Sequence, residues 1–168
     1  FVTRLEQALL AHHADIAVHS LKDVPSPLQA EFQLAAFLKR DPSSDVLISK
    51  HGLTLDRLPK GAKIGTSSPR RQAQLKRFRP DLTILSLRGN INTRIQKLDE
   101  GHLDAIILAH AGLYRMGLEG RITEILSHEV MLPAVGQGTL VVECLKNRQI
   151  SDLAKINDPK SELISRAE

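Results

Sequence analysis

Residues 62–109 read AKIGTSSPRRQAQLKRFRPDLTILSLRGNINTRIQKLDEGHLDAIILA, and this stretch decides the fold. Short apolar runs alternate in it with longer segments whose apolar residues recur every three to four positions, as on one face of a helix. The pattern predicts three strands and two helices: strands at 62–65, 82–87 and 104–109, and helices at 69–78 and 91–100. Strands separated by helices of about ten residues indicate βαβ units and an α/β fold with a mainly parallel sheet.

The sequence on either side of this stretch extends the α/β pattern. It predicts a helix at 3–13, strands at 15–19, 32–38, 45–48 and 139–145, and a helical segment around 112–116. Two segments, 39–44 and 133–138, interrupt the pattern with polar, proline and glycine residues. If the chain leaves one lobe at the first segment and returns at the second, two connections join two lobes, as in hinge-bending binding proteins.

The composition excludes several classes of protein. With 42% hydrophobic and 25% charged residues, the chain is typical of a globular protein and not of a disordered one. No apolar run approaches the roughly 18 residues of a membrane span, and no basic-then-apolar leader opens the chain, so we expect no membrane partner and no export. The single cysteine, Cys144, excludes an internal disulfide, suits a reducing cytoplasm, and is expected to be a small core residue of its apolar strand.

The excess positive charge lies in one region of the chain. Residues 66–115 contain nine Lys/Arg and four Asp/Glu, a local net charge of +5 within a total of +4. Such a region predicts an anionic partner. With no Trp and 3% aromatic residues, the chain offers little on which nucleic-acid bases could stack. Arginines beside Gly, Ser and Asn turns suit small carboxylates or phosphates better, so nucleic acid ranks below small anions.

A first group of polar residues follows the strand at 62–65, at the sheet edge where open α/β folds bind ligands. Ser68 and Pro69 suit the N-cap and the first position of the next helix. The free N–H groups of that helix start, with nearby hydroxyl and guanidinium groups, would surround an anion. The residues concerned are Thr66, Ser67, Ser68, Arg70 and Arg71. The alternative is an ordinary helix cap with solvated arginines.

A second group follows the strand at 82–87. Arg88 closes this strand, Arg94 lies in the first turns of the next helix, and Gly89 permits the sharp exit between them. Because a helix N-terminus disfavours a cation, a bound anion would offset a local cost at Arg94. Arg115, after the third strand, repeats the arrangement. Each arginine alone could be a solvated surface residue, but three strand ends that carry arginine favour a ligand site.

A third group, 20–23, follows the strand at 15–19. A carboxylate placed after a strand and beside a lysine, as Asp23 is beside Lys22, can stabilise a cationic intermediate. The alternative is a Lys–Asp surface pair of little energetic value. The seven histidines lack metal-ligand spacing, so we expect them to be structural or solvated, and no nucleotide-binding glycine pattern occurs.

Five motifs, taken in order and spacing, resemble the porphobilinogen deaminase (hydroxymethylbilane synthase) family over essentially the whole chain. They are HSLKDVP (19–25), GTSSPRR (65–71), LRGNINTR (87–94), DAIILA (104–109) and PAVGQG (133–138). The resemblance implies a cytoplasmic, monomeric enzyme of three domains, the first two of which form a bilobal, periplasmic-binding-protein-like α/β fold with mixed, mainly parallel sheets and two hinge crossings. Residues 1–38 and 139–156 would then belong to domain 1, 40–133 to domain 2, and 157–168 to the start of a linker toward an absent third domain.

The resemblance also implies an activity and a set of site residues. The family condenses four porphobilinogen units, with loss of ammonia, into the linear tetrapyrrole hydroxymethylbilane on a covalently held dipyrromethane cofactor. Asp23 resembles the catalytic carboxylate, which would stabilise pyrrole nitrogens as they become cationic, and the arginines would hold acetate and propionate groups. The positions that match cofactor or substrate contacts of the family are Ser20, Lys22, Thr66, Ser67, Ser68, Arg70, Arg71, Arg88, Asn90, Arg94 and Arg115. No metal site is implied.

Two departures from the family pattern bear on these expectations. Pro69 stands where the family usually has an apolar non-proline residue, which bears on the local geometry of Arg70. The family's cofactor-anchoring cysteine lies in the third domain and Cys144 does not match it, so the chain by itself is expected to be inactive. The alternative to an enzyme is a non-enzymatic bilobal module that binds organic anions, which shares the architecture and would also carry arginines at strand ends.

Overall fold

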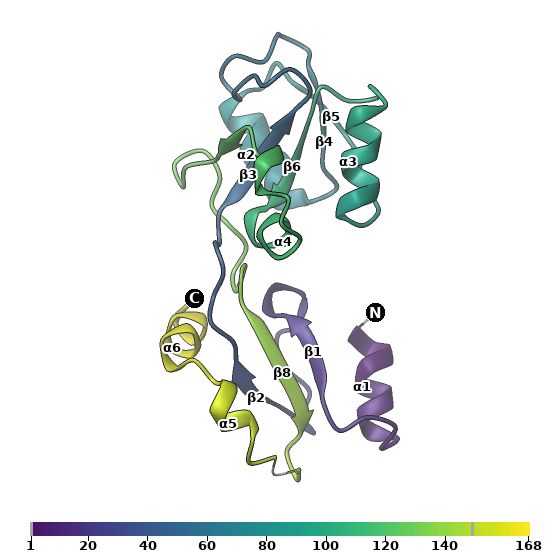
Figure 1. The fold of residues 1–168 in the computed structure, drawn as a ribbon, viewed down its shortest axis with the longest axis vertical. Coiled ribbons are helices and arrows are strands. Elements are labelled where there is room, and N and C mark those ends of the chain that lie inside the picture. The colour runs from purple at the N-terminus through teal and green to yellow at the C-terminus, as the bar shows by residue number, and fades with distance from the viewer. Residues whose placement is uncertain (1, 149) are drawn as a thin grey trace. The chain divides into compact units, whose positions relative to one another are not determined.

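The computed structural model describes residues 2–148 and 150–168. The chain forms two compact units: unit 1 comprises Phe1–Asp41 and Val135–Glu168, and unit 2 comprises Pro42–Ala134. The chain therefore passes from unit 1 to unit 2 once and returns once (Figure 1). The expected bilobal organisation with two crossings is confirmed, while the exact domain boundaries given above stay predictions.

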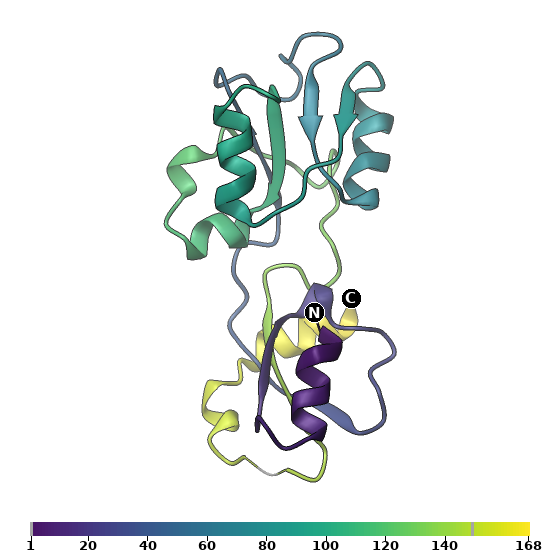
Figure 2. The same ribbon diagram turned by 90° about the vertical axis from the view of Figure 1, so that its right-hand side faces the viewer.

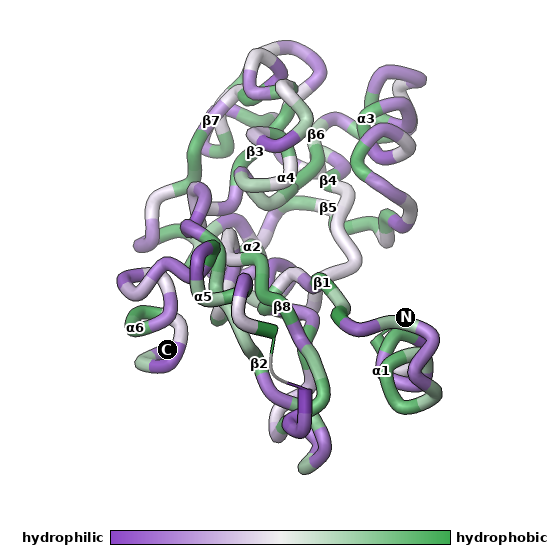
Figure 3. The backbone as a smooth tube through the Cα atoms, turned by 60° about the horizontal axis from the view of Figure 1, so that its bottom comes forward, coloured by the Kyte–Doolittle hydropathy of each residue, from purple (hydrophilic) through white to green (hydrophobic). Residues whose placement is uncertain are grey.

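Unit 1 is built on a three-stranded antiparallel sheet in the order β1-β8-β2. Its elements are α1 (Val2–Leu10), β1 (Ala17–Ser20), the short 3-10 helix η1 (Leu21–Asp23), β2 (Phe32–Phe37), β8 (Leu140–Leu145), α5 (Leu153–Ile156) and α6 (Pro159–Ala167). The central strand β8 is largely hydrophobic (Figure 3). Its register with β1 places Ser20 opposite Leu140, so β8 fixes the point at which β1 ends and η1 begins.

Helices cover both faces of the sheet in unit 1. On one face Leu9 of α1 packs in a buried cluster with Phe32 of β2. On the other face Leu153 of α5 packs with Val142 of β8. The amphipathic spacing of the first helix is explained by this packing, because its apolar side chains face the sheet.

Residues 157–168, predicted to lead toward a further domain, contain α6 and belong to unit 1. The guanidinium of Arg166 lies over the ring of Phe37, 5.1 Å from its centroid. The carboxylate of Glu168 pairs with Arg40 at 2.6 Å. The role of this segment as a linker stays a prediction.

Unit 2 is built on a five-stranded mixed sheet in the order β5-β4-β6-β3-β7. Its elements are β3 (Asp45–Ser49), β4 (Lys63–Gly65), α2 (Pro69–Phe78), β5 (Thr83–Leu85), α3 (Ile91–Asp99), β6 (Ala105–Ala109), α4 (His110–Arg115), η2 (Glu119–Arg121) and β7 (Glu124–Ile125). Helices α2 and α3 lie on opposite sides of the sheet (Figure 2). Leu75 of α2 packs into one buried cluster and Leu98 of α3 into the other. The sheet is thus covered by helices on both faces, as the alternating pattern of 62–109 predicts.

The sheets are mixed, as expected, but the expectation of mainly parallel pairing is wrong. Strand β4 is parallel to β5 and β6, whereas β3 is antiparallel to β6 and β7 and both pairings in unit 1 are antiparallel. Parallel neighbours need a crossover connection, which α2 and α3 provide among β4, β5 and β6. Strands β3 and β8 instead follow the crossings between the units, and the regular βαβ pattern does not extend to them.

The first helix is shorter than its predicted range of 3–13 and ends at Leu10. His12 has a φ of 56°, and the N–H of His13 donates to the carbonyl of Ala8 at 2.9 Å. This is the left-handed C-terminal turn in which glycine is the usual residue. A histidine there is uncommon, which is why the sequence did not indicate the end of the helix.

Two further elements of unit 2 differ from their predicted ranges. The strand predicted at 82–87 is limited to β5, because the N–H of Leu87 donates to Oγ of Ser67 (2.9 Å) and not to a neighbouring strand. Helix α4 begins at His110, directly after β6, and so earlier than the predicted 112–116. Among the helices that the structure describes, none combines the length and apolar character needed to cross a membrane.

Gly138 lies where the segment before β8 passes close to the segment after β2. Its φ is +93°, and a Cβ at this position would lie 2.4 Å from the backbone oxygen of Asp41. We expect Gly138→Ala to destabilise unit 1 by more than the roughly 1–2 kcal/mol that a left-handed backbone costs, because a backbone atom must also move. Urea unfolding of the chain measures the loss. Gly120→Ala is the control, since nothing lies within 4 Å of a Cβ at Gly120, and equal effects of the two substitutions would contradict the prediction.

Candidate functional site

Four segments of unit 2 meet at one edge of its sheet. Strands β4, β5 and β6 run parallel, so their carboxyl ends share this edge. Strand β3 runs the other way, and its first residue, Asp45, lies opposite Ala109 at the end of β6. The predicted gathering of strand-end residues at one edge is therefore present, and the start of β3 adds a carboxylate that the sequence analysis did not include.

The hydroxyl groups after β4 hold the loop that leads into α2. Thr66 is buried, and its Oγ1 accepts a hydrogen bond from the N–H of Ser68 at 3.2 Å. Oγ of Ser67 lies 2.9 Å from Oγ of Ser86 and 2.9 Å from the carbonyl oxygen of Leu87, which ties this loop to the one after β5. The three predicted hydroxyl residues are thus brought together, and each has at least one partner within the protein.

The start of α2 has the predicted cap. Oγ of Ser68 accepts from the N–H of Arg71 at 3.5 Å, and Pro69 occupies the first turn. A helix that begins here directs its first N–H groups toward the sheet edge. The capping role is confirmed, and an anion-binding role for the same groups stays a prediction.

Arg70 and Arg71 share one buried carboxylate, that of Asp45. Nη2 of Arg71 lies 2.6 Å from Oδ1 and Nη2 of Arg70 lies 2.7 Å from Oδ2. Asp45 is fully buried and Arg71 is 6% exposed. Arg71 also donates through Nη1 to the carbonyl of Ile107 at 3.1 Å. The alternative of a solvated arginine is therefore wrong for Arg71: all three nitrogens of its guanidinium donate hydrogen bonds within the protein.

Asp45 is the residue of this site that the sequence analysis missed. It was included in the strand predicted at 45–48 without a role. A charged residue at the start of an otherwise apolar strand, DVLIS, was the available signal. Because a buried carboxylate needs a counter-charge, this position indicated that one of the nearby arginines is a structural partner.

Arg94 approaches the same network from α3. Its Nε donates to the carbonyl of Gly89 at 2.7 Å, and Gly89 has the φ of +119° that the predicted sharp exit needs. Burial lowers the pKa of Arg94, and the positive charge of Arg71 lowers it further. Two guanidinium groups thus lie close enough to repel each other, a cost that a bound anion would remove.

The remaining predicted residues of unit 2 lie around this network or further along the chain. Asn90 is the N-cap of α3, its Oδ1 accepting from the N–H of Thr93 at 2.9 Å. Arg88 is exposed, and in the described part of the chain its guanidinium has no hydrogen bond or ion pair. Arg115 is the last residue of α4 and is exposed. Among the predicted residues of unit 2, those around Arg71 at the sheet edge therefore make the closest contacts with one another.

This edge carries a net positive charge. Arg70, Arg71, Arg88 and Arg94 contribute four charges, and Asp45 compensates one of them. Planar guanidinium groups in a partly buried position bind carboxylates and phosphates well, because each can donate two parallel hydrogen bonds. The arrangement can therefore bind a small polyanion.

The predicted residues of unit 1 lie in and beside η1. The N–H of Leu21 donates to the carbonyl of Thr139 (2.9 Å), so the turn is fastened to the start of β8. Nζ of Lys22 donates to Oε1 of Gln137 at 3.2 Å. Asp23 is exposed, and the structure gives its carboxylate no hydrogen bond or ion pair with any described residue. Lys22 and Asp23 form no ion pair in the described part of the chain, and a ligand-binding role for Asp23 stays a prediction.

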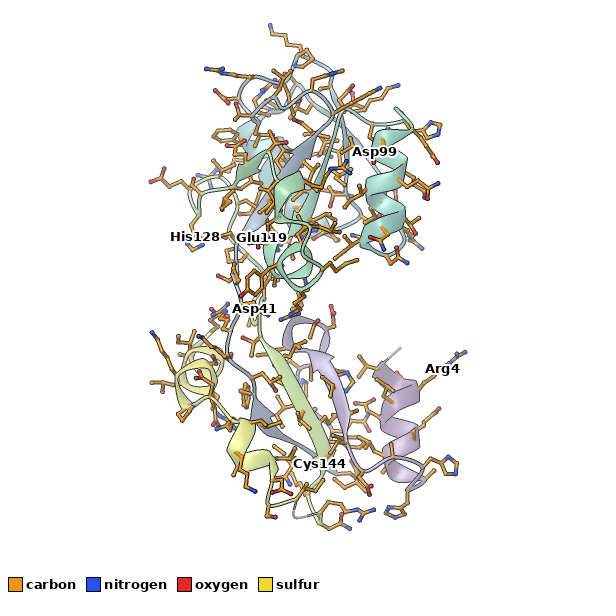
Figure 4. All side chains as sticks on the ribbon, viewed as in Figure 1. Arg4, Asp41, Asp99, Glu119, His128 and Cys144 are labelled. Carbon is orange, nitrogen blue, oxygen red and sulfur yellow. The ribbon has the colours of Figure 1, made fainter. Side chains whose placement is uncertain are left out.

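Cys144 is a core residue, as predicted. It lies in β8 (Figure 4), is 1% exposed, and has Nε2 of Gln33 3.6 Å from its sulfur. A buried thiol in an apolar strand is unreactive. Within residues 2–148 and 150–168, no group of three His, Cys, Asp or Glu side chains could hold a metal ion.

Comparison with known sequences identifies relatives of the chain. The family described as porphobilinogen deaminase, dipyromethane cofactor binding domain, matches residues 1–152. The chain is 48% identical to the porphobilinogen deaminase of Chlorobium phaeovibrioides, covering 100% of the chain and 54% of the relative. It is 51% identical to that of Francisella tularensis, covering 57% of the relative. The chain thus spans about half the length of the curated relatives it matches.

Comparison with solved structures identifies the fold. A second substrate-binding domain of a putative amino acid ABC transporter from Streptococcus pneumoniae matches with a TM-score of 0.60 at 16% identity, over 99% of the chain and 74% of that domain. A putative methionine-binding lipoprotein from Bacillus subtilis matches with a TM-score of 0.57 at 14% identity, over 99% of the chain and 75% of that protein. At this level of identity the likeness shows the fold alone, and it confirms the expected binding-protein-like α/β architecture.

Proposed function

The chain belongs to the porphobilinogen deaminase family, and from this premise we propose that the protein that carries it is a hydroxymethylbilane synthase, a transferase. It joins four porphobilinogen units head to tail, with loss of ammonia, in haem and tetrapyrrole biosynthesis. The match of residues 1–152 to the family's cofactor-binding domain is the observation that carries this proposal. We further propose that the protein is cytoplasmic and monomeric and has no nucleic-acid or membrane partner.

The residues present fit a dipyrromethane cofactor. Each pyrrole of such a cofactor carries an acetate and a propionate, and the edge of unit 2 offers uncompensated guanidinium groups for them. The positive charge of Arg71 adds to the lowering of the pKa of Arg94 by burial, and an anion bound at this edge would offset that repulsion. No described residue forms a hydrogen bond or ion pair with the guanidinium of Arg88. When bound, the cofactor supplies the pyrrole carbon to which the first substrate unit is joined.

We propose that the residues of the chain have two roles: one group binds the cofactor and substrate, and Asp23 stabilises charge or transfers protons. The binding group consists of Thr66, Ser67, Ser68, Arg70, Arg71, Arg88, Asn90, Arg94 and Arg115, with Ser20 and Lys22 from unit 1. Asp23 carries the catalysis: its free carboxylate accepts hydrogen bonds from pyrrole N–H groups and stabilises positive charge that develops on those nitrogens. Its exposure, and the absence of a hydrogen bond or ion pair to its carboxylate from any described residue, support this role.

We propose that the covalent anchor of the cofactor is a cysteine outside this chain. Cys144 is buried within β8, where its sulfur is out of reach of a ligand. The relatives are nearly twice as long as the chain, which leaves room for a further domain that carries the anchor. On this proposal the 168-residue chain is inactive by itself.

Binding of porphobilinogen to the 168-residue chain tests the role of the arginines. We expect Arg88→Ala and Arg94→Ala each to weaken binding by about tenfold or more, because each removes a charge-assisted pair worth about 1.5–3 kcal/mol. Isothermal titration at two salt concentrations measures this. Arg77→Ala is the matched control, since Arg77 is an exposed arginine in the last turn of α2.

The same titration separates the proposed enzyme from other anion-binding proteins. A dicarboxylate panel that binds as tightly as porphobilinogen would favour a non-enzymatic organic-anion module, and tight, salt-sensitive binding of oligonucleotides would favour a nucleic-acid partner. Mass spectrometry of the full-length protein tests whether the cofactor is covalently bound, and we expect a covalent dipyrrole adduct. Its absence from a folded full-length protein would contradict the proposed function.

A further inference from the structure

Unit 1 buries three ionisable side chains that the proposed site does not use. Glu6 of α1 is 3% exposed, His19 of β1 is 6% exposed, and Glu143 of β8 is fully buried. They come from three different elements: His19 contacts Glu143 between β1 and β8, and the charge of Glu6 in α1 acts on the carboxyl of Glu143 and raises its pKa. Buried ionisable groups are costly unless they are paired, so their presence calls for a specific role.

The contacts among the described residues do not supply a hydrogen-bond donor to every carboxylate oxygen of this group. Nε2 of His19 lies 3.0 Å from Oε2 of Glu143. One buried oxygen of Glu6 and one of Glu143 have no hydrogen-bond partner among the described residues. An ionised carboxylate with an unpaired buried oxygen carries a large desolvation cost, which a proton on one of the two acids removes.

The position of this group along the chain connects it to η1. His19 immediately precedes Ser20, and β1 is a four-residue edge strand that pairs with β8 alone. A strand this short has few ladder hydrogen bonds, and the buried contact between His19 and Glu143 adds a side-chain link between β1 and β8 next to the end of β1. The turn that follows carries Asp23, and no described side chain holds Asp23 itself.

We propose that Glu6, His19 and Glu143 form a buried, proton-holding support that fixes the turn bearing Asp23, which makes His19 and Glu143 positioning residues for the catalytic carboxylate. The proposal rests on the proposed function for the role of Asp23. The structural part of it, that this group fixes the turn, stands independently of that function.

The support has a definite pH dependence. Burial raises the pKa of Glu143 and the charge of Glu6 adds to this, while the hydrogen bond and charge of His19 act in the opposite direction. From the packed elements, α1 contributes Glu6 and β1 contributes His19, and β2 places Leu34 opposite Glu143. Because the folded state holds the proton more tightly than the unfolded state, the stabilisation is complete below the ordinary glutamate pKa and is lost as pH rises through the raised value.

Amide hydrogen exchange in the 168-residue chain tests the structural part without any activity measurement. The N–H groups of Leu21 and Val24, bonded to the carbonyls of Thr139 and Leu21, report on the turn. We expect their protection factors to fall at least several-fold as pH rises from about 4 to 9, because the folded state loses the Glu143 proton that stabilises it. In Glu143→Gln, which keeps an acceptor for His19 but cannot ionise, we expect protection to stay constant over this range.

Matched controls come from unit 2. The amide of Thr66, bonded to the carbonyl of Leu85, should keep its protection in every variant. Glu100→Gln removes the carboxylate of an exposed His–Glu pair, with His102 3.6 Å from Glu100, and should leave the turn unchanged. The same fall in wild type and Glu143→Gln, or no fall in either, would overturn the proposal.

Kinetics of the full-length enzyme test the positioning role. We expect His19→Phe to lower kcat by 10- to 100-fold with KM nearly unchanged, because a displaced catalytic group impairs the reaction more than substrate binding. In Glu143→Gln, which keeps an acceptor for His19 and cannot ionise, we expect kcat to lose the part of its pH dependence that comes from release of the buried proton. His102→Phe, at an exposed histidine, is the control.

The two possible failures are distinguishable. If His19→Phe lowers thermal stability but keeps normal kcat in the folded enzyme, the group only stabilises the fold and the positioning proposal is wrong. If Asp23→Asn itself is fully active while the exchange experiment succeeds, the proposed function fails and the support of the turn remains. Should His19→Phe not fold, Glu6→Gln replaces it: we expect this variant to retain the turn and to shift the pH at which protection falls to lower values.

Discussion

Asp23→Asn is expected to reduce turnover of the full-length enzyme by 10²-fold or more while leaving its fold intact. Asparagine has nearly the shape of aspartate but no negative charge, so it cannot offset positive charge that develops on a pyrrole nitrogen. Loss of one such electrostatic or proton-transferring group costs about 10²–10⁴ in rate. The fold should not change, because Asp23 is exposed and makes no hydrogen bond or ion pair with a described residue.

The rate of tetrapyrrole formation, measured with the cofactor already in place, checks this expectation. Circular dichroism and thermal unfolding show whether the fold is intact. Asp152→Asn, which removes an exposed carboxylate of unit 1 that pairs with Lys155 at 2.6 Å, is the matched control and should leave turnover unchanged. Near-normal turnover by Asp23→Asn would remove the central residue of the proposed mechanism.

Asp45→Asn is expected to destabilise unit 2 strongly, by about 3–5 kcal/mol, the usual cost of removing one partner of a buried ion pair. Asp45 is fully buried and holds both Arg70 and Arg71, so its loss leaves two guanidinium groups without a counter-charge. Arg94 lies close enough to Arg71 to add to their repulsion. The sheet edge would therefore carry four positive charges and no compensation.

Urea unfolding of the 168-residue chain, followed by signals from unit 2, measures this loss. Asp99→Asn is the control, because Asp99 pairs with Arg121 on the exposed side of α3 and should contribute little. Phosphate or a dicarboxylate should restore stability to Asp45→Asn more than to the wild type, since an anion at the edge replaces the lost charge. Equal stability of wild type and Asp45→Asn would mean that the network is not a stabilising element.

The alternation of apolar and amphipathic segments in 62–109 predicted the core of unit 2 because it depends on local chemistry. Strand and helix periods are properties of neighbouring residues, and caps such as Ser68 with Pro69 act within one turn. The same locality explains the misjudged helix end, where His12 adopts a conformation that glycine usually takes. Strand direction in β3 and β8 was not predictable in this way, because it depends on where the crossings enter the sheets.

The candidate site was predicted as a set of residue types, and its internal structure was not. The motifs indicated that Arg70, Arg71, Arg88 and Arg94 gather at strand ends, and all lie there. The sequence did not distinguish Arg71, which is buried against Asp45, from Arg88, which is exposed. The two residues differ by their three-dimensional neighbours, since Asp45 is 26 positions from Arg71 along the chain.

For this protein, the sequence by itself determined the α/β class, the bilobal organisation, the family and the identity of the polar residues at the strand ends. Each of these follows from local periodicity, capping or motif spacing, which a linear chain carries in full. Only the tertiary structure decided which charges are paired. The partnership of Asp45 with two arginines and the burial of Glu6, His19 and Glu143 together depend on contacts between distant segments. Burial and charge pairing are properties of the folded surroundings, because desolvation and Coulomb energy depend on distance in space and not on distance along the chain.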